Sequence, residues 1–131
     1  MCKVYNNLKK TIKKLRGPKG CPWDKKQTHK TLIKYLKSEV EEFIECQQNN
    51  DYEGMKEELG DILLQIFMHA QIASENKKFN IDDVFKTLNK KLVRRHPHVF
   101  NKTKINSIND IIINWEKIKQ EEILEKRGGV S

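Results

Sequence analysis

Two pairs of carboxylates with the same spacing are the residues in this sequence best suited to chemistry. Glu39 and Glu42 stand three residues apart, and so do Glu58 and Asp61. Residues three apart on a helix share a face, so each pair presents both carboxylates to one side. Carboxylates held together in a partly dry site raise one another's pKa or recruit a cation. Oxygen ligands of this kind select Mg²⁺ or Mn²⁺, and Mg²⁺ typically keeps waters and takes substrate phosphates.

The two pairs meet if the helices that carry them are antiparallel neighbours. A short turn near Asn50 separates these helices, and short connections join antiparallel neighbours. Counted from the turn, Glu42 lies nearly as far back as Glu58 lies forward, and the same holds for Glu39 and Asp61. At about 1.5 Å per residue, each facing pair is level to within about 2 Å. The sequence therefore predicts that four carboxylates converge from two facing helices.

Two other interpretations of the acidic residues compete with a magnesium site. A solvated acidic face is the usual explanation for a single Glu-x-x-Glu. Gly60 argues against it, because a glycine within a helix costs about 1 kcal/mol and close helix approach would explain it. A di-iron bundle requires Glu-x-x-His, and no histidine of this chain has a glutamate three residues before it. Magnesium is therefore favoured.

Apolar residues recur every three or four positions and predict an all-α chain, a bundle of about five helices. The first four helices are expected over 3–16, 28–49, 52–75 and 83–95, and the fifth begins after Ser107. Asp51, Asp82 and Ser107 are the expected N-caps of the last three helices. Gly128 and Gly129 are placed in a short flexible tail. Part of the apolar face of 52–75 stays uncovered in a monomer, which favours dimerisation.

Composition excludes several classes of protein. The chain has 131 residues, of which 37% are apolar and 34% charged, so its core is lean. No stretch approaches the roughly 18 apolar residues of a membrane span, and the first ten residues hold no apolar signal core. The cysteines are scattered without Cys-x-x-Cys spacing, which favours reduced thiols in the cytoplasm over disulfides or a zinc site. They are Cys2, Cys21 and Cys46.

The net charge of +8 hides an uneven distribution. Residues 1–37 carry +11, residues 38–61 carry −8 and residues 62–131 carry +5. A plain nucleic-acid binder needs a continuous basic face, which the acidic block interrupts. The pattern disfavours nucleic acid and suits a site that holds cations beside a polyanion. The basic first third keeps a nucleic-acid binder open as a rival class.

A basic cluster follows the acidic block and could bind phosphate. Lys91 and Arg95 are four residues apart on the helix expected over 83–95, with Arg94 beside them. Arginine forks match phosphate oxygens and a lysine adds a point charge. The alternative is a basic helix end that complements the helix dipole.

The two tryptophans are candidates for stacking on a base. Trp115 shares the apolar face of the last helix, so core packing is its simplest role. Trp23 lies in the Pro-Trp-Asp loop and could instead plug one end of the bundle. Either residue could contact a nucleotide, and Trp115 is the stronger candidate.

The blocks that carry these residues closely resemble the MazG nucleotide pyrophosphohydrolase family. The matching segments are CPWDKKQTHKTLIKYL (21–36), EVEEFIE (39–45), EELGDILLQIFMHAQIA (57–73), KLVRRHPHVF (91–100) and INWEKIKQEE (113–122). The resemblance covers about residues 8–127 and implies one domain over 1–131. It also implies the fold of the all-α NTP pyrophosphatases.

Members of that family hydrolyse nucleoside triphosphates to monophosphate and pyrophosphate with Mg²⁺, as dimers or higher assemblies. The family's metal pattern falls on Glu39, Glu42, Glu58 and Asp61. Its phosphate-contacting pair falls on Lys91 and Arg95, and Trp115 resembles a position near the nucleotide. The sequence departs from the family at Ser38, where relatives usually have a glutamate.

The departure at Ser38 keeps one alternative open, a catalytically weak nucleotide-binding or regulatory module of the same fold.

Overall fold

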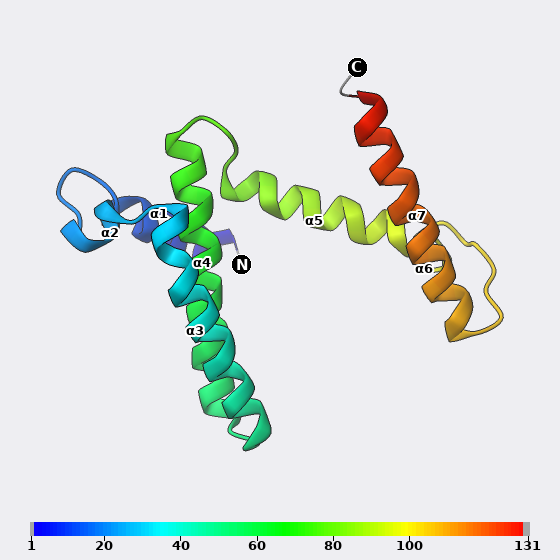
Figure 1. The fold of residues 1–131 in the computed structure, drawn as a ribbon, viewed down its shortest axis with the longest axis horizontal. Coiled ribbons are helices and arrows are strands. Elements are labelled where there is room, and N and C mark those ends of the chain that lie inside the picture. Colours follow the sequence, from blue (N-terminus) through cyan, green and yellow to red (C-terminus); the bar gives the residue numbers. More distant parts are fainter. Residues whose placement is uncertain (1, 130–131) are drawn as a thin grey trace. The chain divides into compact units, whose positions relative to one another are not determined.

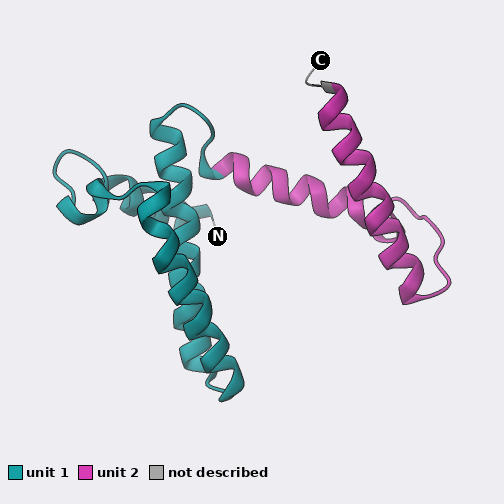
Figure 2. Ribbon diagram, in the orientation of Figure 1, with its two compact units in different colours: residues 1–81 teal, residues 82–131 magenta. Residues whose placement is uncertain are grey.

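The computed structural model describes residues 2–129, and every regular element among them is a helix (Figure 1). The helices are α1 (Cys2–Leu15), α2 (Pro22–Lys26), α3 (His29–Gln48), α4 (Tyr52–Glu75), α5 (Ile81–Arg95), α6 (Pro97–Phe100) and α7 (Ile108–Gly129). The chain divides into two compact units, unit 1 (residues 1–81) and unit 2 (residues 82–131) (Figure 2). Among the described residues, no helix has both the length and the apolar character needed to cross a bilayer.

The all-α class is confirmed, but the expected count of about five helices is too low. The two additional helices, α2 and α6, each occupy a loop and begin with a proline at the first helical position. Proline there is pre-set for the helical φ angle and needs no hydrogen-bond partner for its nitrogen. A helix of four or five residues is too short to show apolar periodicity, so only its proline could have indicated it.

Two expected helix ends are wrong and two caps are right. Helix α5 begins at Ile81, so Asp82 lies in its first turn and is not the residue that precedes the helix. Helix α7 extends through Gly129, which was expected in the flexible tail. Asp51 caps α4, because its carboxylate accepts the Gly54 backbone N–H at 3.0 Å. The Asp110 N–H likewise donates to the Ser107 hydroxyl at 3.3 Å.

In unit 1 the antiparallel pair α3 and α4 forms the framework, and α1 packs against α4 (Figure 1). The turn between α3 and α4 is tight because Asn50 adopts a left-handed backbone conformation, with φ of 56°. Gly54 lets the two helices approach: a Cβ on this residue would meet the Cys46 Sγ at 2.6 Å. The expectation that Gly60 serves close helix approach is wrong, because a Cβ there would meet nothing within 4 Å.

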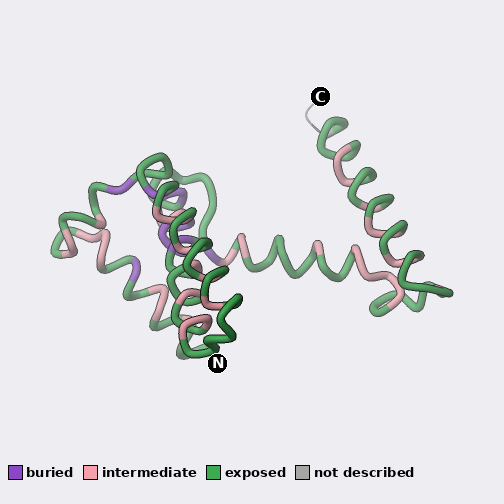
Figure 3. The backbone as a smooth tube through the Cα atoms, turned by 60° about the horizontal axis from the view of Figure 1, so that its bottom comes forward, coloured by how far each residue is buried: buried purple, intermediate pink, exposed green. Residues whose placement is uncertain are grey.

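The buried apolar residues all lie in unit 1, and none is buried in the described part of unit 2 (Figure 3). Leu32 of α3 and Met68 of α4 are the largest fully buried side chains, 1% and 2% exposed. Arg16 fastens the loop after α1 to α4 through two hydrogen bonds to Glu75, at 2.8 and 2.9 Å. It also donates to the carbonyls of Asp24 and Gln27, at 2.6 and 3.0 Å. Most of this small core is therefore contributed by α4, with single residues from α1 and α3.

Candidate active site

Three of the four predicted carboxylates come together where α3 faces α4. Glu39, Glu58 and Asp61 each place one oxygen so that all three atoms lie within 4.8 Å of one another. Glu42 is exposed and is not one of the three, although it interacts with both Glu39 and Glu58. The register expected from the turn is therefore present in the structure. Metal binding by these residues stays a prediction.

The electrostatics of the cluster show crowded negative charge. Burial raises the pKa of Glu39 to about 7, helped by hydrogen bonds with Glu58 and Glu42 and by the charges of Asp61 and Glu42. The hydrogen bond with Glu39 lowers the pKa of Glu58. Burial together with Glu42 and Asp61 outweighs that effect, so the pKa of Glu58 is also raised. Such shifts mark a site where a positive charge would be stabilised.

The hydrogen bonding of the cluster fits a cation. Oε2 of Glu39 and Oε2 of Glu58 are both buried and have no hydrogen-bond partner among the described residues. Buried carboxylate oxygens without a donor are costly. A divalent cation would satisfy them, and Mg²⁺ would complete its six ligands with waters and phosphate oxygens. Glu39, Glu58 and Asp61 are therefore suited to hold Mg²⁺ or Mn²⁺, with Glu42 at the edge.

The predicted phosphate-binding residues lie in unit 2, where carboxylates of α7 hold two of them. Arg95 donates from Nε and Nη2 to Glu122, at 3.1 and 3.4 Å. Its guanidinium carbon lies 5.0 Å from the ring centroid of Trp115, so the two residues that the sequence singled out are in contact. The side chains of Arg95 and Glu122 are only 12% and 18% exposed. Glu122 therefore binds the Nε edge of the Arg95 guanidinium.

Arg94 is bound differently from Arg95. Both of its Nη atoms donate to Glu125, at 2.9 and 2.6 Å. This pairing lowers the pKa of Glu125. The end of the Arg94 fork is therefore occupied, whereas Arg95 uses only its Nε edge.

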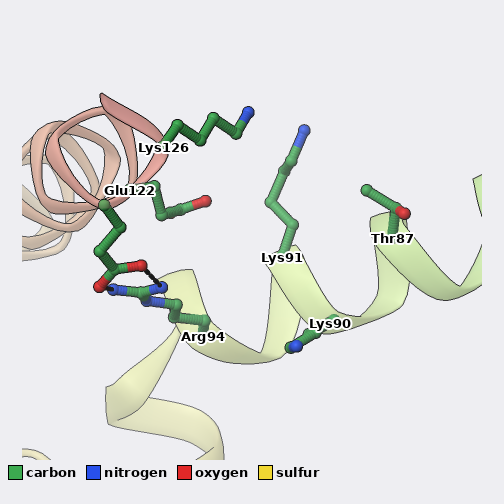
Figure 4. A pocket seen from close by; sticks show the side chains of 7 residues that line it. Thr87, Lys90, Lys91, Arg94, Glu122 and Lys126 are labelled. Atoms are coloured by element: carbon green, nitrogen blue, oxygen red, sulfur yellow. Dashed lines mark hydrogen bonds and ion pairs between the residues drawn. The ribbon is translucent and has the colours of Figure 1, made fainter. Parts of the chain in front are cut away.

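Lys91 lines a pocket of about 440 Å³ between α5 and α7 (Figure 4). Figure 4 shows the side chains of Lys91 and Lys126 extending from the two helices over this pocket. The lining residues are Thr87, Lys90, Lys91, Arg94, Glu122, Glu125 and Lys126. A pocket with more cations than carboxylates can accept an anion.

Trp23 belongs to unit 1, in the short helix α2. Its ring meets the ring of Tyr35 edge to face, with centroids 5.4 Å apart, and it is 48% exposed. A half-exposed tryptophan keeps area free for a ligand.

Sequence reasoning missed the partners of the basic cluster. Glu122 and Glu125 lie 27 and 31 residues after the arginines that they bind. Such pairs depend on how α5 packs on α7. The only signal in the sequence is that acidic residues of α7 recur at helical spacing.

Comparison with known proteins identifies the family of the chain. Residues 27–100, which include the four carboxylates and the basic cluster, match the MazG nucleotide pyrophosphohydrolase domain. The chain is 49% identical over 118 residues to the Bacillus subtilis protein YabN, described as uncharacterized, covering 90% of this chain and 24% of that one. It is 48% identical over 124 residues to the nucleoside triphosphate pyrophosphohydrolase/pyrophosphatase MazG of Thermotoga maritima, covering 95% of this chain and 47% of that one.

A solved structure of a MazG-related protein also matches this chain. The crystal structure of a MazG-related protein from Thermotoga maritima matches with a TM-score of 0.69 and 29% identity, over 86% of this chain and 96% of that one. The chain spans a quarter to a half of the length of the two relatives named above. The matched region holds more than half of the chain and all the carboxylates of the cluster. The chain therefore belongs to the MazG nucleotide pyrophosphohydrolase family.

Proposed function

We propose that this chain is a Mg²⁺-dependent nucleoside triphosphate pyrophosphohydrolase that cleaves between the α- and β-phosphates and releases a monophosphate and pyrophosphate. The observation that carries the proposal is the convergence of Glu39, Glu58 and Asp61, two of them with a buried, unpartnered oxygen. The name of the Thermotoga maritima relative, a nucleoside triphosphate pyrophosphohydrolase/pyrophosphatase, supports this reaction class.

The carboxylates of unit 1 divide into ligands and a proton acceptor. Glu39, Glu58 and Asp61 hold Mg²⁺, or Mn²⁺ in its place, which when bound neutralises phosphate charge and lowers the pKa of water. Glu42 stands outside the three-oxygen cluster and is exposed. One of its carboxylate oxygens accepts the proton of the attacking water.

The residues of unit 2 bind the phosphate chain. Glu122 holds the Nε edge of Arg95 and Trp115 covers its face, which leaves N–H donors of the guanidinium for a phosphate oxygen. Lys91 adds a point charge, and both cations stabilise the leaving pyrophosphate. Arg94 contributes less, because its two Nη atoms are already bound to Glu125.

The chain acts as a homodimer or a higher homo-oligomer. The α3–α4 pair leaves several large apolar side chains exposed, and their contact with water is unfavourable in an isolated unit. These are Ile33, Val40, Ile44, Leu59, Leu63, Leu64 and Ile66.

The three cysteines are free thiols, in keeping with a reducing cytoplasm.

Product analysis tests the proposed reaction. The protein is incubated with a panel of NTPs and dNTPs, with Mg²⁺ or with EDTA, and the products are separated by ion exchange. We expect monophosphate and pyrophosphate in equal amounts, with Mg²⁺ only. Glu42→Gln should abolish turnover, whereas Glu53→Gln, a change of an exposed glutamate on α4 paired with Lys56, should not. Nucleotide binding without turnover in the wild type would favour the non-catalytic module instead.

A further inference from the structure

The facing residues of α3 and α4 follow one register, which extends beyond the carboxylates. Steps of four and three residues along α3 match equal steps along α4, as expected for an antiparallel pair with a 3.6-residue repeat. The structure supports this register at two places, where Gly54 lies beside Cys46 and where the carboxylates cluster. Continued by equal steps along both helices, the register assigns each residue of α3 a partner at the same level, meaning the same height, on α4. The successive levels are then Cys46 and Gly54, Glu42 and Glu58, Glu39 and Asp61, Tyr35 and Gln65, and Leu32 and Met68.

The level between the carboxylates and the apolar core holds an unsatisfied polar group. Gln65 is 6% exposed, yet its Oε1 has no hydrogen-bond partner among the described residues. A buried amide oxygen normally has a donor from protein or ligand. Position 65 is therefore polar and buried, whereas Leu32 and Met68, one level further along the two helices, are apolar and fully buried.

On α3, the residue at the same level as Gln65 is aromatic, and the aromatic ring beside it is partly exposed. Tyr35 lies one helical turn before Glu39, and its ring is met edge to face by Trp23. Trp23 is half exposed. Gln65 lies one turn after Asp61, about 6 Å along the helix. That distance matches the step from a metal-bound phosphate to the sugar and base of the same nucleotide.

We propose that Gln65 is a specificity-determining residue whose Oε1 accepts a hydrogen bond from an N–H or O–H of the substrate's nucleoside half. Tyr35 and Trp23 form the aromatic wall beside it. The inference rests on the proposed function, because the phosphates must lie on the carboxylate cluster for the nucleoside to reach this level.

The test separates the nucleoside from the phosphates. Isothermal titration calorimetry with Mg²⁺ measures the Kd of α,β-methylene nucleoside triphosphates and of inorganic tripolyphosphate, which has no nucleoside. Gln65→Met removes the polar atoms at similar length. We expect the Kd of the nucleotide analogue to rise about 2- to 13-fold, the range of one hydrogen bond, with the Kd of tripolyphosphate unchanged. Met68→Leu, a change at the neighbouring apolar level, should alter neither constant.

The identity of the donor follows from a comparison of analogues. A hydroxyl donor predicts that Gln65→Met removes a preference between ribo- and 2′-deoxy or 3′-deoxy analogues, and a base donor predicts that it flattens the preference among bases. An unchanged nucleotide Kd, or an equal rise for tripolyphosphate, would overturn the role of Gln65. Because the readout is binding, a wild type that binds the analogue without hydrolysing NTPs would refute the proposed reaction and still test Gln65. A wild type that binds no analogue would refute both.

Discussion

Replacing Arg95 by lysine removes the guanidinium fork while keeping the positive charge. Arg95 uses its Nε edge for Glu122 and rests on Trp115, so its remaining donors are pre-positioned for phosphate. A charge-assisted hydrogen bond contributes about 1.5–3 kcal/mol, which corresponds to roughly a 10- to 150-fold change in binding. We therefore expect Arg95→Lys to raise KM for the nucleotide by about 10- to 150-fold, with a smaller effect on kcat.

The neighbouring arginine supplies the matched control for this prediction. Arg94→Lys makes the same chemical change, but both Nη atoms of Arg94 bind Glu125 on an exposed surface. Exposed ion pairs contribute little, so KM should change less than about threefold. Steady-state pyrophosphate release over a range of nucleotide concentrations measures both constants, and circular dichroism checks helix content. An unchanged KM in Arg95→Lys, or an equal rise in Arg94→Lys, would refute the assignment of Arg95.

Three further predictions concern stability. Leu32→Ala, at a fully buried position of the small core, should lower the free energy of unfolding by about 2–5 kcal/mol, measured by urea denaturation; a loss below about 1 kcal/mol would contradict the core assignment. Gly60→Ala should raise that free energy by about 0.5–1 kcal/mol, since a Cβ meets nothing within 4 Å, and a loss would show that its face is covered in solution. The Arg16 guanidinium lowers the pKa of Glu75, so this pair stabilises the fold above about pH 4.5 and the contribution is lost as the pH falls through the lowered pKa. The difference in unfolding free energy between wild type and Glu75→Gln should shrink accordingly in acid, and a pH-independent difference would contradict this.

The convergence of the carboxylates was accessible from the sequence because two strong regularities fix it. Helical periodicity sets which residues share a face, and the short turn at Asn50 sets the register between the helices. The same arithmetic extends to Gln65 opposite Tyr35. The burial of Gln65, however, and its unpartnered oxygen became evident only from packing.

Other features depend on packing that no local pattern encodes. The pairing of Arg94 and Arg95 with glutamates of α7 requires the arrangement of two separate helices. Gly60 is a case in which a local pattern misled: a glycine within a helix indicated close approach of the two helices, but the close approach occurs at Gly54. Both glycines lie in α4, and only packing shows that Gly54, near the start of the helix, is the one that lies against Cys46 of α3.

Direct measurement of metal binding tests the central claim, that the carboxylates shared by α3 and α4 form a divalent cation site. Mn²⁺ is titrated into the nucleotide-free protein at pH 8, above the pKa of about 7 of Glu39, and free Mn²⁺ is followed by its EPR signal. We predict saturable binding in the wild type and in Glu53→Gln, and at least tenfold weaker binding in Asp61→Asn and Glu58→Gln. Equal binding in all four proteins, or none in the wild type, would contradict the account.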